Sequence, residues 1–343
     1  MIHNKNIHLT ERETTILKFT VEEFIVTNRP IGSSYLKKHH RFNISPATIR
    51  NTLSVLESKG LVMQPHTSSG RIPTDLGYRY YVDCLMDTSS SNLGDVEKWS
   101  SVLKTLSSNI EDLMQATATM LAKASQFFGV VLVSQIQRGI LKDIEFISLS
   151  SDRIMVVLAM ESGIVRSMVF NLKISIRQDD LRYINQILNE QLTGHTLEEI
   201  QATVRERLHD TTIYNHEIVQ ILIRQSKEYF TLPANNLIFT STNQFLLMQP
   251  EFQQIDIIKA TLHTLEKQKI KRMLMSHGNQ SKETMIIGRE NSDNAFKQFS
   301  VLSTGFQSEY LVGQLAVLGP TRIPYKNIKT ILEKFSEIIP HVC

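Results

Sequence analysis

A helix start signal followed closely by a hairpin signal constrains this chain more than any other feature. Ser45 can accept a hydrogen bond from the backbone N–H of Thr48, and Pro46 suits the first helical position, where no N–H is needed. Apolar residues then recur at helical spacing until a glycine ends the pattern. Segments 61–65 and 70–74 read as two short strands around a turn-rich tip. A capped helix followed by a small hairpin predicts a winged helix-turn-helix.

The outward face of that helix is suited to contact with nucleic acid. Its residues are small or polar, with one arginine on the flank: Ala47, Asn51, Ser54, Ser58 and Arg50. We expect Asn51 and Arg50 to read base edges, because Asn pairs well with adenine and Arg with guanine. Ser45 and Thr48 would contact phosphates at the helix N-terminus. Asn51 could instead serve only in capping or packing.

The positive charge of the chain gathers on the same region. The chain carries a formal net charge of +3, and its first 90 residues account for all of that excess. Between positions 29 and 71 a single acidic residue, Glu57, stands against these basic ones: Arg29, Lys37, Lys38, Arg41, Arg50, Lys59 and Arg71. We assign Lys37, Lys38 and Arg71 to phosphate contacts, with the minor groove as an alternative for Arg71 at the wing. Tyr78 or Arg79 could also touch phosphate. A basic face that is merely solvated is the competing interpretation.

Several segments resemble one known family. In the first quarter of the chain they are L-T-E-R-E-x-x-I-L (9–17), R-P-I-G-S-S-Y-L (29–36), S-P-A-T-I-R-N (45–51), P-H-T-S-S-G-R-I-P-T (65–74) and G-Y-R-Y-Y-V-D (77–83). A second block contains P-E-F (250–252), I-G-R-E-N (287–291) and G-Q-L-A-V-L-G-P-T-R-I-P-Y (313–325). Together these segments resemble the HrcA family of heat-inducible transcription repressors.

That resemblance implies a bacterial homodimeric repressor of chaperone operons, which binds double-stranded DNA at an inverted repeat called CIRCE. It also implies release on heat shock and an activity supported by the GroE chaperonin system. The middle domain of the family is GAF-like and is split by an inserted dimerisation domain. The I-G-R-E-N segment is a structural signature of the family, and we place Arg289 and Glu290 on opposite faces of a strand.

Strand-like and helical stretches alternate along the rest of the chain, which indicates the α+β class. A helix at 107–126 and strand-like segments between 129 and 171 predict one antiparallel sheet, and a single helix is expected at 255–271 before strands resume. A sheet that is interrupted and resumed predicts an inserted domain. The expected division is a winged helix-turn-helix domain at 1–90, a GAF-like domain at 95–177 and 251–343, a mostly helical inserted dimerisation domain at 178–250, and a polar linker at 87–94.

The helix expected at 213–230 carries apolar residues around more of its circumference than one core face needs. We expect its surplus apolar surface, including Ile218 and Leu222, to meet a second copy of the chain across a two-fold axis. An inverted-repeat operator also requires a dimer, because each half-site takes one recognition helix.

The sequence gives no sign of an enzyme, a metal site or a cofactor. Ser34 and Lys37 have the spacing of a serine nucleophile and its base, but no G-x-S-x-G, glycine-rich phosphate loop or H-E-x-x-H occurs. His39 and His40 are adjacent on a helix and cannot chelate together. No apolar run approaches membrane-spanning length, and two distant cysteines fit a cytoplasmic location. Two alternatives stay open: a winged-helix regulator controlled by a small ligand in its GAF-like domain, and an enzyme with an appended DNA-binding module.

Overall fold

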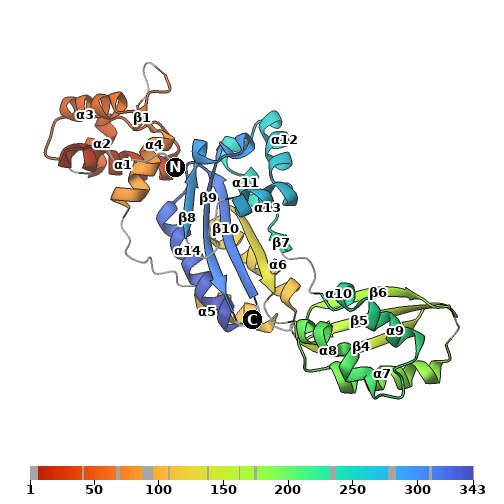
Figure 1. Cartoon of the computed structure of the whole chain (residues 1–343). Helices are drawn as coiled ribbons and strands as arrows, with labels where there is room; N and C mark the ends of the chain where they lie inside the picture. The colour runs from red at the N-terminus through yellow and green to blue at the C-terminus, as the bar shows by residue number, and fades with distance from the viewer. Residues whose placement is uncertain are drawn as a thin grey trace.

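The computed structural model describes residues 7–40, 42–66, 70–86, 96–106, 109–136, 139–161, 163–173, 176–231, 237–276, 283–308 and 311–342. In Figure 1 its elements form three units, which we call the N-terminal, central and inserted units. No helix within these ranges is long and apolar enough to cross a membrane. The expected linker at 87–94 lies outside the described residues, as do Arg41 and the hairpin tip at 67–69.

The N-terminal unit consists of three helices, a hairpin and a closing helix. In chain order they are α1 (Glu11–Thr27), α2 (Ser33–His40), α3 (Pro46–Ser58), β1 (Val62–Met63), β2 (Ile72–Pro73), α4 (Asp75–Tyr80) and the π-helical turn η1 (Tyr81–Leu85). Asn28 ends α1 in the left-handed conformation at φ 49°, and Gly60 follows α3 at φ 73°. Ile16, Leu36 and Leu56 are among the fully buried residues that hold the helices together.

The central unit is built on a five-stranded antiparallel sheet in the order β7-β3-β10-β9-β8. Its strands are β3 (Phe128–Ile136), β7 (Leu237–Thr240), β8 (Thr284–Ile287), β9 (Phe299–Gln307) and β10 (Leu311–Pro320). The 3-10 turn η3 (Gly288–Glu290) follows β8, and η4 (Asn294–Phe296) precedes β9. The central strand β10 alternates between the two faces, so that Leu315 and Val317 belong to one core and Ala316 and Leu318 to the other.

Helices cover both faces of this sheet (Figure 1). One face packs on α6 (Ile110–Ser125) and α14 (Tyr325–Ile338), with α5 (Val96–Thr105) beside α6 and η5 (Ile339–His341) closing the chain. The other face packs on α11 (Gln244–Leu247), η2 (Pro250–Phe252), α12 (Ile255–Thr264) and α13 (Lys267–Ser276). The single helix expected at 255–271 is therefore two helices, since α12 ends before Leu265 and α13 starts at Lys267.

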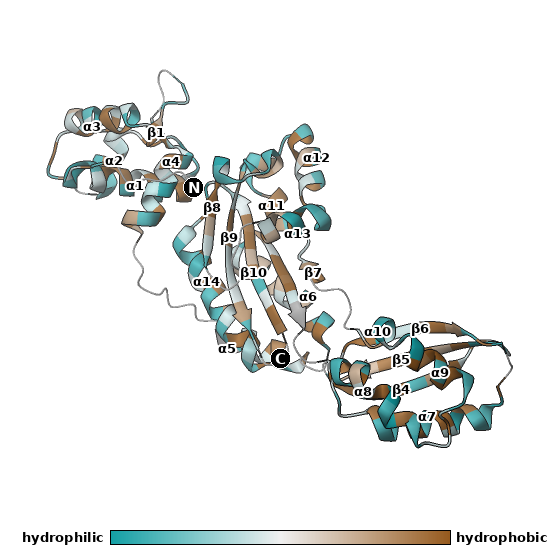
Figure 2. Cartoon of the chain, viewed as in Figure 1, coloured by the Kyte–Doolittle hydropathy of each residue, from teal (hydrophilic) through white to brown (hydrophobic). Residues whose placement is uncertain are grey.

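The inserted unit has a sheet of its own. Strands β4 (Leu141–Ser148), β5 (Arg153–Met160) and β6 (Val165–Asn171) form a three-stranded antiparallel sheet in that order. Helices α7 (Gln178–Leu192), α8 (Leu197–His209), α9 (Glu217–Arg224) and α10 (Ser226–Tyr229) complete the unit. Figure 2 shows hydrophobic residues along these strands, and the side chains of Ile154, Val156 and Leu158 are fully buried beneath the helices.

The separate sheet corrects the expected domain boundaries. Strand β3 pairs with β7 on one side and with β10 on the other, so it has no free edge at which β4 could join. The insert therefore begins before β4 rather than at residue 178, and it is a mixed sheet-and-helix unit rather than a mostly helical one. Segment 237–250, expected in the insert, supplies β7 and α11 to the central unit.

Candidate nucleic-acid interface

The recognition-helix candidate α3 begins as the sequence predicts. Ser45 is extended at φ −73° and ψ 155°, and its hydroxyl accepts a hydrogen bond from Thr48 N at 3.1 Å. The two hydroxyl oxygens, of Ser45 and Thr48, lie 2.9 Å apart. Pro46 stands at the first helical position, where it withdraws no donor. Both hydroxyls therefore lie together at the positive end of a helix dipole, where an anion is favoured.

The faces of α3 also divide as expected. Its buried side consists of Ile49, Thr52, Leu53 and Leu56. Its exposed side consists of Ala47, Arg50, Asn51, Ser54, Val55 and Ser58. The side chains of Arg50 and Asn51 form no hydrogen bond or ion pair with any other described residue, so capping or packing within the chain does not occupy Asn51. Both side chains are free to meet an external partner.

The hairpin beside α3 is tied to the loop that precedes α2. Val62 pairs with Pro73 and Met63 with Ile72. The backbones of Arg71 and Ile31 exchange two hydrogen bonds of 2.8 Å. At Gly70 a Cβ atom would lie 2.5 Å from the carbonyl oxygen of Ile31, so this close approach requires glycine.

Glu57, near the end of α3, joins the helix to residues that directly follow β1 and precede β2. Its carboxylate lies 2.8 Å from Nη2 of Arg71 and 3.0 Å from Nε, and it also accepts the backbone N–H of Gln64 at 3.1 Å. The Arg71 side chain is only 15% exposed. The structure therefore places this guanidinium between helix and hairpin, rather than projecting from the tip, which the charge count could not show.

The other basic residues differ in how freely they present their charge. Lys59 lies 3.0 Å from Glu13, whose pKa is held below its usual value first by the backbone hydrogen bond from Thr10 and then by Lys59. Lys37 donates to the carbonyl of Phe42, and no carboxylate in the described part of the chain forms an ion pair with it. Lys38 is exposed at the end of α2.

Tyr78 and Arg79 are not available to phosphate. Tyr78 is 2% exposed, and the guanidinium of Arg79 is bound to Glu290 of the central unit. Glu290 itself lies in the 3-10 turn η3 and not in the strand that we expected. Of the adjacent histidines, His40 lies 2.8 Å from Glu23 while His39 stacks on Tyr35. Within the described ranges no three potential metal ligands come together.

The N-terminal unit combines a capped helix that has a free polar face with a neighbouring hairpin and a basic region. These features are typical of transcription regulators. The family model described as "HrcA protein C terminal domain" matches residues 111–328. The heat-inducible transcription repressor HrcA of Chlorobium chlorochromatii (strain CaD3) is 31% identical over 329 residues, which cover 94% of each chain. The repressor of the same name from Pelotomaculum thermopropionicum is 29% identical, with 97% of each chain covered. The chain belongs to the HrcA family of heat-inducible transcription repressors and is not an enzyme.

A solved structure supports the fold. The structure described as a hypothetical protein at 2.2 Å resolution superposes with a TM-score of 0.66, covering 98% of this chain and 100% of that one. The sequences are 23% identical, so the likeness concerns the fold alone.

Proposed function

We propose that the protein is a sequence-specific repressor of heat-shock chaperone operons. It binds the inverted repeat CIRCE as a homodimer in the cytoplasm, leaves the DNA on heat shock, and depends on the GroE chaperonin for its activity. The observation that carries the proposal is the pair of free side chains, Arg50 and Asn51, on a capped helix in a member of a repressor family. CIRCE, the homodimer and the chaperonin come from the family resemblance.

In this proposal the N-terminal unit is a winged helix-turn-helix that inserts α3 into the major groove. Asn51 and Arg50 read base edges, while Ser45 and Thr48 hold a phosphate at the helix N-terminus. Lys37 and Lys38, at the end of α2, bind the neighbouring backbone. Arg71 contributes chiefly by holding the wing against Glu57.

The proposed dimer contact uses the inserted unit but not the helix that the sequence indicated. Ile218 and Leu222 of α9 are fully buried within their own unit, so they offer no surface to a second copy. The apolar surplus lies instead on the outer face of the three-stranded sheet. There Ile147, Met155 and Val169 stand side by side across β4, β5 and β6. Ile147 is 37% and Val169 45% exposed.

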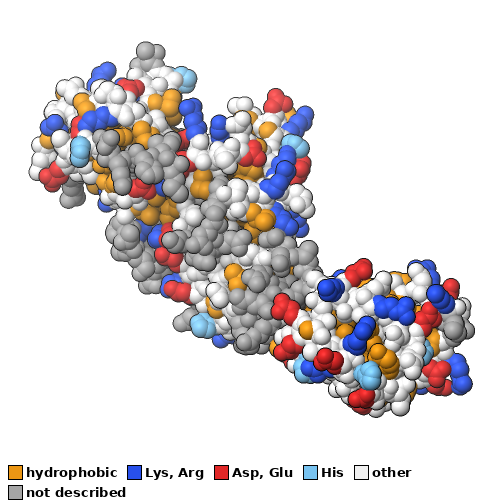
Figure 3. Space-filling model, viewed as in Figure 1, with side chains coloured by type: hydrophobic (Ala, Val, Ile, Leu, Met, Phe, Trp, Pro, Cys, Tyr) orange, Lys and Arg blue, Asp and Glu red, His pale blue; other side chains and the backbone are white. Residues whose placement is uncertain are grey.

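We propose that a second copy of the chain covers this outer sheet face. Asn189 of α7 covers the free edge of β4 by bonding both the N–H and the carbonyl of Ile144, at 2.8 and 2.7 Å. On the face shown in Figure 3, charged side chains of both signs are spread over the inserted unit. An inverted-repeat operator requires two N-terminal units, and exposed apolar residues on the unit farthest from them can join two copies of the chain (Figure 1).

The ligand-controlled alternative treats the central unit as a GAF-like sensor. One observation favours it: Gln314 of β10 is 2% exposed, and its amide oxygen has no hydrogen-bond partner in the described structure. A ligand that binds only the folded protein would raise its melting temperature. Thermal titration against metabolite pools therefore tests this alternative.

The deciding experiment for the proposal is a footprint on two promoters, that of the protein's own operon and that of the chaperonin operon. We expect protection of both arms of an inverted repeat. Protection outside the two arms of the repeat would reject the proposed function. So would the absence of protection at protein concentrations that already bind random DNA.

A further inference from the structure

The N-terminal unit is docked on the central unit by buried polar contacts. Arg79 of α4 donates from Nε to Glu290 Oε1 at 2.7 Å, and from Nη2 to Glu290 Oε2 and to the carbonyl of Met285. Its third nitrogen, Nη1, donates to Asp83 at 3.0 Å. The side chains of Arg79 and Glu290 are 15% and 11% exposed. A bidentate arginine–carboxylate pair of this kind fixes orientation as well as distance.

The turn that carries Glu290 is shaped to receive α4. Asp75 accepts the backbone N–H of Arg289 at 2.9 Å. Gly288 has φ 53°, and a Cβ atom there would lie 2.3 Å from the Asp75 carboxylate. Asn291 is 2% exposed and holds the turn from inside, because its amide donates to three backbone carbonyls at 2.9 to 3.0 Å. The I-G-R-E-N segment is therefore a preformed receptor for the N-terminal unit.

A second docking point joins helix α1 of the N-terminal unit, which we call the head, to the central unit. Arg322 of the central unit donates to the carbonyl of Ile25 near the end of α1 at 2.7 Å, and to Glu251 at 2.8 Å. Between the two points the buried rings of Tyr78 and Tyr325 pack with their centroids 5.8 Å apart. Two separate anchors with an apolar contact between them restrain both rotation and translation of the head. Helix α3 lies on the side of the head away from the central sheet (Figure 1).

We propose that Arg79 and Glu290 are positioning residues that fix the spacing between the two reading helices of the dimer. This inference rests on the proposed function. Heads carried by dimerised inserts match one half-site separation only if each head is rigid on its own central unit. The pair does not touch DNA, so its loss leaves the contact of one head with one half-site intact. What is lost is the selection of operators by the distance between their halves.

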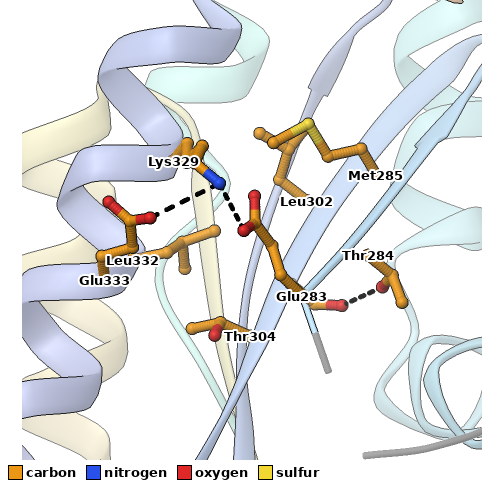
Figure 4. A pocket seen from close by; sticks show the side chains of 9 residues that line it. Glu283, Thr284, Met285, Leu302, Thr304, Lys329, Leu332 and Glu333 are labelled. Atoms are coloured by element: carbon orange, nitrogen blue, oxygen red, sulfur yellow. Dashed lines mark hydrogen bonds and ion pairs between the residues drawn. The ribbon is translucent and has the colours of Figure 1, made fainter. Parts of the chain in front are cut away.

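The test measures full-length protein by fluorescence anisotropy on three kinds of duplex. The first carries the CIRCE inverted repeat, and the second carries the same repeat with its spacer lengthened by about five base pairs, which is half a helical turn. The third carries one half-site alone. The variants are Glu290→Gln and Arg79→Gln. The matched control is Glu283→Gln, which removes the ion pair of Glu283 with Lys329 inside the central unit (Figure 4).

We expect Glu290→Gln and Arg79→Gln each to bind the natural repeat about tenfold more weakly than wild type and to bind the half-site within about twofold of wild type. The ratio of affinities for the two spacings should also be smaller in each variant than in wild type. The double variant should lose no more than either single one, because both remove the same contact. The control should keep the wild-type spacing preference. A folded Glu290→Gln variant with the wild-type spacing preference, or with an equal loss on the half-site, overturns the positioning role. A wild-type protein that does not prefer the repeat to random DNA rejects the proposed function itself.

Discussion

At the scale of single residues, the free side chains of α3 lead to a clean prediction about DNA sequence reading. Arg50 and Asn51 have no partner among the described residues, so Arg50→Ala and Asn51→Ala should change the free energy of unfolding by less than about 0.5 kcal/mol. Each variant should lose about 1–3 kcal/mol of preference for operator over random duplex. Anisotropy titrations with both duplexes measure this, and Lys123→Ala on α6 is the control. An unchanged operator preference in both variants would show that α3 does not read the bases.

A second residue-scale prediction concerns Glu13 and acid. The carboxylate accepts the backbone N–H of Thr10 at 2.7 Å and lies 3.0 Å from Lys59, and these contacts lower its pKa from an ordinary value of 4.5. A pKa that is lower in the folded chain stabilises the fold above 4.5, and the stabilisation disappears as the pH falls through the folded-state value. Glu13→Gln can still cap the helix but cannot gain a proton. At about pH 7 it should be less stable by about 0.5–2 kcal/mol.

Urea unfolding at several pH values tests the role of Glu13. The stability gap between wild type and Glu13→Gln should shrink once the pH drops below 4.5, because the carboxyl of the unfolded wild-type chain then takes up a proton while the folded one is still ionised. The gap should reach its acid limit when the pH has fallen through the lower pKa of the folded chain. A gap that stays constant with pH would mean that the charge of Glu13 does not contribute to folding.

At the scale of elements, the hairpin depends on the ion pair beneath it. Arg71→Ala should weaken binding to all duplexes by loosening the wing, while the salt dependence of binding stays near the wild-type slope. Lys38→Ala should instead lower that slope by about one, as expected for one lost phosphate contact. Glu57→Gln should resemble Arg71→Ala, because both break the same pair. If Arg71→Ala lowers the salt slope as much as Lys38→Ala does, Arg71 contacts phosphate directly.

The elements also show what the sequence could and could not predict. The start of α3 and its exposed face depend on residues within one or two turns, and both were correctly predicted. The grouping of strands depends on pairing across the insert, where β7 and β10 take both edges of β3, and no local pattern contains that information. A count of charges around Arg71 likewise does not show that this residue pairs with Glu57 in the folded chain. For the same reason the apolar circumference of α9 indicated a dimer contact, although the unit's own sheet and helices bury it.

At the scale of the whole molecule, the outer face of the inserted sheet is the surface that we propose for the dimer contact. Ile147 and Val169 flank Met155 on this face and are 37% and 45% exposed, so charged residues there remain solvated in a monomer. In a dimer closed over this face the same charges would be buried, at several kcal/mol each. Ile147→Glu with Val169→Glu should therefore leave the chain folded and convert it from a dimer to a monomer of 39.2 kDa.

Sedimentation velocity separates the two states, and far-UV circular dichroism verifies that the double variant is folded. The control is Val26→Glu on α1, where a side chain that is 81% exposed lies in the N-terminal unit. The monomeric variant should bind a single half-site as well as wild type does but lose the affinity that two linked heads add on the full repeat. Ile218→Glu should instead unfold the inserted unit, because that side chain is fully buried. A folded Ile147→Glu, Val169→Glu protein that still sediments as a dimer would place the two-fold contact on another face of the chain.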